Sequence, residues 1–152
     1  MPKKSIPLTR LYVLDTNILL HEPLAFLSFK ENDVVIPMTV LEELDYIKDS
    51  KKDVARDARV SIRAMEDILH EATPEQMTAG VSLEGLTAGE SAPTGRISIF
   101  ADHTLEDEHK VFTSNENDNN IISAALHLQK EQSPRQVVLV LSLIHISEPT
   151  RR

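Results

Sequence analysis

The chain has 152 residues, of which 41% are hydrophobic and 4% aromatic, and it carries a formal net charge of −8 with no cysteine and no tryptophan. Its length suits one domain with a core of its own. The lack of cysteine excludes disulfides and thiolate metal sites, the few aromatic residues argue against the stacking surface of a general single-strand binder, and the negative charge argues against nucleic-acid binding as a bulk property.

Strand-like and helix-like patterns alternate along the chain. Apolar runs predict strands at about 11–15, 33–36 and 136–140, and an alternating segment predicts another at 96–100. Helices are expected at about 24–29, 38–49, 53–71 and 118–131. Residues 72–95 hold all four glycines and predict a long loop or a partly disordered insertion. This order predicts an α/β protein with three layers (α/β/α) and a mostly parallel central sheet.

Short acidic motifs lie at the ends of these elements. Asp15 ends the first strand, Glu42 and Glu43 lie in the first turns of the helix after the second strand, and Asp118 lies at the start of the 118–131 helix. The carboxyl ends of parallel strands form one edge of an open α/β sheet, so we expect the carboxylates to gather there. Such a cluster suits a hard divalent cation and predicts metal-assisted cleavage of a phosphodiester bond. Thr16, Asn17, Ser114 and Asn117 would orient the carboxylates.

Each motif also has a simpler structural interpretation. Asp15, Thr16 and Asn17 are good helix N-caps, and acids near a helix N-terminus interact favourably with its dipole. Amides and acids such as those around Asp118 are common at helix starts. Glu42 and Glu43 point about 100° apart on a helix, so only one of them can face the strand ends. The joint order of the motifs is more specific than any one of them.

Basic residues follow the second acidic motif. Lys52, Arg56, Arg59 and Arg63 are spaced by 4, 3 and 4 residues, which predicts a stripe on the 53–71 helix opposite its apolar stripe. This stripe is either a solvated helix face or a surface that contacts RNA phosphates. The six histidines lack metal-ligand spacing, and no glycine-rich phosphate loop of the GxxxxGK[ST] type occurs.

The last twelve residues, 141–152, resemble the translation of a sequencing adapter. We therefore expect a domain over 1–140 and a non-native tail over 141–152; the alternative is an ordinary strand that ends in a polar tail. No apolar run approaches the ~18 residues of a membrane-spanning helix, and no secretory segment follows the basic start. We expect a cytoplasmic protein without membrane contact.

Four segments resemble the PIN-domain nucleases, specifically the amino-terminal PIN module that some bacterial proteins fuse to a PhoH-like ATPase. The resemblance covers about residues 8–140 and rests on segments 14–21, 35–45, 56–59 and 117–122. It implies a five-stranded parallel sheet, a Mg²⁺ or Mn²⁺ ion held by Asp15, Glu43 and Asp118, and cleavage of single-stranded RNA. Glu43 matches the family position better than Glu42. ATP binding would come only from the missing PhoH-like domain, and homo-oligomerisation is left open.

One feature departs from the family pattern. A further acid usually follows the strand that matches Val137–Val140, and Leu141-Ser142-Leu143 stands there instead. Asp102 and Glu116 lie elsewhere in the sequence and are poor substitutes. We interpret the departure as a C-terminal truncation, which puts the activity of this chain in doubt.

Other functions compete with this hypothesis. The chain could be a non-catalytic module that binds RNA or protein. A phosphatase-like hydrolase with Asp15 as nucleophile would need an acid two residues later, where Asn17 stands. A flap-type DNA nuclease would need more acids and a helical arch.

Overall fold

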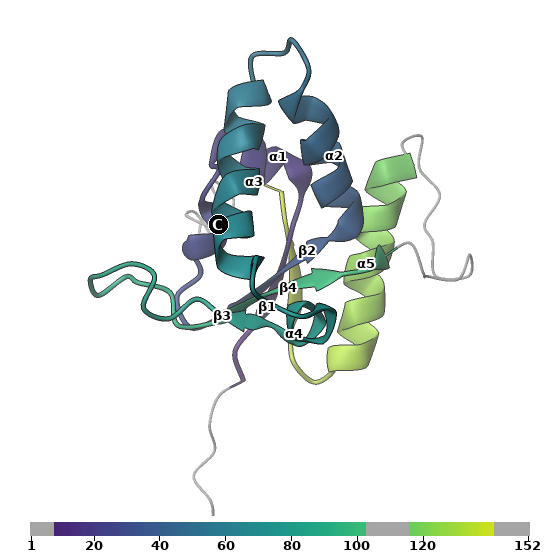
Figure 1. Ribbon diagram of the computed structural model, residues 1–152. Coiled ribbons are helices and arrows are strands. Elements are labelled where there is room, and N and C mark those ends of the chain that lie inside the picture. The colour runs from purple at the N-terminus through teal and green to yellow at the C-terminus, as the bar shows by residue number, and fades with distance from the viewer. Residues whose placement is uncertain (1–7, 103–115, 142–152) are drawn as a thin grey trace, which may run out of the picture.

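A five-stranded sheet forms the centre of the molecule (Figure 1). The computed structural model describes residues 8–102 and 116–141, and only the backbone over 116–119. The strands are β1 (Leu11–Leu14), β2 (Asp33–Pro37), β3 (Val81–Ser82), β4 (Arg96–Phe100) and β5 (Val137–Val140), in the order β3-β4-β2-β1-β5. Four strands pair in parallel and β3 runs antiparallel to β4. The prediction of a mostly parallel α/β sheet is confirmed. The expectation of five parallel strands is wrong for β3, the antiparallel strand at one end of the strand order.

Helices follow most of the strands. They are α1 (Thr16–His21), α2 (Met38–Lys48), α3 (Ala55–Leu69), α4 (Pro74–Ala79) and α5 (Glu116–Gln132), and a 3₁₀ turn, η1, spans Ala25–Leu27. The predictions for α2, α3 and α5 are confirmed within two residues at each end. The helix expected at 24–29 is only the turn η1, and α1 was not predicted.

The alternation of side chains along the strands produces two packed faces. Tyr12 and Leu14 point into the larger core, which contains Leu44 of α2 and Met65 of α3, whereas Leu11 and Val13 join Leu128 of α5 in a second core. Figure 1 shows α1, α2 and α3 gathered on one side of the sheet. All four residues of β1 are buried, as expected for a parallel strand covered on both faces.

The segment 72–95 is more ordered than its glycine content predicts. Thr73 and Gln76 form a reciprocal capping box that starts α4, and β3 follows directly after Gly80. Residues 83–95 contain no helix or strand. Gly95 passes so close to β2 that a Cβ atom there would lie 2.0 Å from the carbonyl oxygen of Asn32. The loop prediction is therefore wrong over α4 and β3, because the local capping bonds outweigh composition.

Within the part of the chain that the structure describes, none of the helices combines the length and apolar character needed to cross a membrane.

Candidate active site

Asp15 lies at the carboxyl edge of the sheet, directly after β1. Its backbone N–H donates to the carbonyl oxygen of Val140 at 3.2 Å, so the end of β5 fixes its position. Asp15 is 8% exposed and stands at the N-cap position of α1, but its side chain makes no capping hydrogen bond to that described helix. Capping of α1 therefore does not account for this carboxylate.

Thr16 connects the first acidic motif to the second. Its buried hydroxyl donates a hydrogen bond to the Oε1 atom of Glu43, across 27 residues of sequence. Glu43 is half-buried on α2, whereas the neighbouring Glu42 is exposed. Of these two adjacent acids, Glu43 is thus the one that the fold joins to the residue beside Asp15.

A small cavity of about 290 Å³ lies where β1, β5 and α5 meet. Asp15 and Asn17 line it from one side, Ile121 and Ile122 line it from α5, and Leu139 and Leu141 complete it. The backbone of Asp118 lies one helical turn before Ile121 and Ile122, inside the first turn of α5. The side chains of Asn117 and Asp118, and the whole of Ser114, lie outside the described residues.

The donor set at this edge has the chemistry of a hard-cation site. Asp15 and Glu43 offer carboxylate oxygens only, which are the ligands that Mg²⁺ and Mn²⁺ prefer. Among the side chains that the structure describes, no group of three or more acids, histidines or cysteines could hold an ion. The structure therefore describes the side chains of two of the three predicted ligands, Asp15 and Glu43. The third, Asp118, lies in the first turn of α5.

Asp102 also lies at this edge of the sheet, although it is far in the sequence from the position after Val140 where the family has a further acid. It follows the end of β4, is 1% exposed, and accepts a hydrogen bond from the backbone N–H of Thr39 at 3.1 Å. Thr39 is in the first turn of α2, whose N-cap residue Pro37 has no capping side chain. Within the described residues, the second Asp102 oxygen and the Thr39 hydroxyl have no hydrogen-bond partner. Asp102 thus holds the start of the helix that carries Glu43. In the sequence, its position two residues after the strand that ends at Phe100 could have indicated a place at the carboxyl edge.

The predicted basic stripe is divided by the fold. Lys52 lies in the turn before α3 and lines a cavity of about 330 Å³ together with Glu43. Arg59 donates to the carbonyl oxygen of Lys48 at 2.8 Å, so it satisfies the C-terminus of α2. Arg56 and Arg63 are exposed on α3. Lys52 is therefore the member of the stripe that lies beside a predicted catalytic residue.

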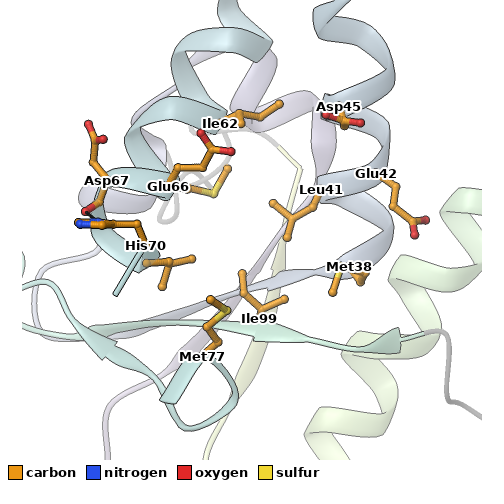
Figure 2. Close-up of a pocket in the computed structure, with 12 residues that line it drawn as sticks. Met38, Leu41, Glu42, Asp45, Ile62, Glu66, Asp67, His70, Met77 and Ile99 are labelled. Carbon is orange, nitrogen blue, oxygen red and sulfur yellow. Dashed lines mark hydrogen bonds between the residues drawn. The ribbon is translucent and has the colours of Figure 1, made fainter. Parts of the chain in front are cut away.

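A larger hollow of about 860 Å³ opens on another side of α2, between α2, α3, α4 and β4. Figure 2 shows Leu41, Ile62 and Ile99 pointing into this space from three different elements. Its acidic residues are Glu42, Asp45, Glu66 and Asp67, and none of the described residues that line it is a lysine or arginine. An apolar floor with acidic margins repels phosphate, so this hollow does not suit a nucleic-acid substrate.

Comparison with known proteins agrees with the fold. The family model described as "PIN domain" matches residues 12–142, and the chain belongs to the PIN domain family. PIN domains are generally nucleases, and those nucleases generally use divalent metal ions.

Similar curated proteins bear the name Protein PhoH2. That of Bacillus subtilis (strain 168) is 33% identical over 135 residues, which cover 85% of this chain and 27% of that protein. That of Thermobispora bispora is 32% identical, and the match covers 87% of this chain and 27% of that protein. That of Mycolicibacterium smegmatis is 28% identical, and the match covers 80% of this chain and 26% of that protein. The resemblance to PIN modules of PIN–PhoH proteins is confirmed. The chain spans about a quarter of the length of these relatives.

Proposed function

We propose that this chain is the nuclease module of a longer PIN–PhoH-like protein and that it cleaves phosphodiester bonds of single-stranded RNA with Mg²⁺ or Mn²⁺. The hydrogen bond between Thr16 and Glu43, formed beside Asp15 at the carboxyl edge of the sheet, is the observation that carries this proposal. Membership of the PIN domain family supports a nuclease, and similarity to PhoH2 proteins supports a longer parent protein.

Asp15, Glu43 and Asp118 are the proposed metal ligands and catalytic residues. A bound divalent ion would lower the pKa of a water molecule and neutralise charge on the phosphate under attack. Thr16 fixes one oxygen of Glu43, so the other oxygen keeps a defined direction. Asn17 is exposed in the cavity that Asp15 lines, where its amide can orient water or substrate. Ser114 and Asn117 remain proposed supporting residues.

The proposed RNA path runs past Lys52 and not through the larger hollow. Lys52 supplies a positive charge in the cavity that Glu43 lines, whereas the charged groups among the described residues of the hollow are acidic, with His70 beside them. Arg56 and Arg63 would extend the contact along α3, and Arg59 would add to it only through the part of its guanidinium that Lys48 leaves accessible. We propose that the PhoH-like part of the longer protein binds ATP. Sedimentation velocity measures whether this chain forms homo-oligomers.

The test is cleavage of labelled single-stranded RNA with Mg²⁺, with Mn²⁺ or with EDTA, and with double-stranded RNA and single-stranded DNA as comparison substrates. We expect metal-dependent cutting of the single-stranded RNA. A version carrying its natural sequence beyond Val140 is assayed in parallel, because we propose that residues 141–152 replace a stretch that supplies a further acid. Cutting by the longer version alone supports this view of the tail. RNA binding without cutting by either version contradicts the nuclease proposal and favours a binding module.

A further inference from the structure

Tyr46 is the most exposed of the large apolar and aromatic side chains that the structure describes, at 76%. It lies on α2 three residues after Glu43, a spacing that places two side chains on the same helix face with Cβ atoms about 5–6 Å apart. An isolated exposed tyrosine is common on protein surfaces and needs no explanation by itself. The position of this ring next to an acid of the candidate site is what makes it informative.

The ring does not stand alone. Tyr46 lines the cavity of about 330 Å³ that also contains Glu43 and Lys52, with Thr39, Glu42 and Ile47 as its other residues. Lys52 is the one cation among these described residues. An exposed aromatic face and a flexible ammonium group, both within one small cavity, match the two chemical parts of a nucleotide, a flat base and a charged phosphate.

We propose that Tyr46 and Lys52 form a nucleotide subsite beside the metal-binding carboxylates, in which an unpaired base stacks on the Tyr46 ring and Lys52 contacts an adjacent phosphate. The inference rests on the proposed nuclease function and adds a selection rule to it. A base inside a duplex is stacked on both faces by its neighbours, so its face is not available to the ring. A base in a single strand is available, and stacking on an aromatic ring tolerates any base identity. The subsite therefore selects single strands without selecting a sequence.

Two sets of matched variants test the subsite by steady-state cleavage of single-stranded RNA. Tyr46→Phe keeps the aromatic face, Tyr46→Leu keeps apolar bulk without it, and Tyr46→Ala removes both. We expect Tyr46→Ala and Tyr46→Leu to raise KM by about 5- to 150-fold with little change in kcat, and Tyr46→Phe to resemble the wild type. Lys52→Ala should raise KM, whereas Lys51→Ala removes an exposed neighbouring charge outside the cavity and should not.

A spectroscopic measurement tests stacking without relying on cleavage. The probe is an oligouridylate that contains one 2-aminopurine, whose fluorescence falls when it stacks on an aromatic ring, and it is titrated with protein carrying Asp15→Asn. We expect quenching with Tyr46 or Tyr46→Phe and none with Tyr46→Leu.

The results separate the subsite from the nuclease proposal. If the wild type cuts RNA but Tyr46→Ala retains the wild-type KM and quenching, the subsite is wrong and the nuclease proposal stands. If Tyr46→Leu behaves like Tyr46→Phe, or Lys52→Ala behaves like Lys51→Ala, the stacking or the phosphate contact is overturned. If neither this chain nor the version extended beyond Val140 cuts RNA, the nuclease proposal fails, and the quenching titration alone decides whether the subsite binds a base.

Discussion

The hydroxyl of Thr16 donates a hydrogen bond to the carboxylate of Glu43, and this bond joins the end of β1 to helix α2. Thr16 is buried directly after Asp15, so the same stretch of chain positions one acid by its backbone and orients another by its side chain. The bond therefore sets the relative placement of the two described carboxylates of the candidate site.

Replacing Thr16 should weaken cleavage more than it weakens the fold. Thr16→Val keeps the shape of the side chain and removes the donor, and loss of such a supporting bond to a metal ligand typically lowers metal affinity or activity by about 10- to 100-fold. Thr16→Ser keeps the hydroxyl and should stay close to the wild type. Cleavage rates across a Mn²⁺ titration measure the effect, and equal rates for Thr16→Val and the wild type would contradict the role given to this bond.

Replacing Asp102 should destabilise the protein by loosening the start of α2. Asp102→Ala leaves the buried N–H of Thr39 without its acceptor, a loss that costs about 1–3 kcal/mol. Asp102→Asn retains an acceptor oxygen, so its loss should be smaller. Urea denaturation measures both changes in the free energy of unfolding. A wild-type stability for Asp102→Ala would show that Asp102 does not hold the helix.

Replacing Gly95 should destabilise the contact between the 83–95 loop and β2. The new Cβ of Gly95→Ala would lie 2.0 Å from the carbonyl oxygen of Asn32, so the backbone must shift, at a cost of about 1–3 kcal/mol or more. Gly89→Ala is the comparison, because a Cβ at Gly89 meets no atom within 4 Å and only the positive φ of 109° opposes it. Thermal unfolding should rank Gly95→Ala below Gly89→Ala, and the reverse order would contradict the close approach.

Much of the fold follows from local sequence, because an apolar run or a periodic apolar pattern favours one type of secondary structure. The strands β1, β2, β4 and β5 are short apolar runs or alternations, and α3 has a clear apolar stripe that includes the buried residues Ala58, Met65 and Leu69. Helix α1 was missed because its six residues carry three consecutive apolar side chains, Ile18 to Leu20, which show no helical period. The start of α4 was visible in the pair Thr73 and Gln76, but the glycines that follow concealed it.

The site could be predicted less completely, since its contacts depend on long-range pairing. The choice of Glu43 over Glu42 came from family resemblance, and the bond from Thr16 is the contact that distinguishes them in the fold. Asp102 meets Thr39 only because β4 pairs with β2, a fact that sequence proximity does not contain. The low aromatic content predicted no stacking surface, and the subsite that we propose depends on the exposure of a single tyrosine, Tyr46.

The most direct test of the central claim compares two adjacent acids in one assay. Cleavage of single-stranded RNA with Mn²⁺ is measured for Glu43→Gln and Glu42→Gln, with Asp15→Asn as a reference, in the version extended by the native sequence that we propose to follow Val140. Both glutamate variants remove one charge from the same turn of α2, so their effects on the surface potential are matched. The account predicts that Glu43→Gln and Asp15→Asn lose more than about 100-fold in rate, while Glu42→Gln stays within about threefold of the wild type. Equal rates for the two glutamate variants, or undiminished cleavage by Asp15→Asn, would contradict it.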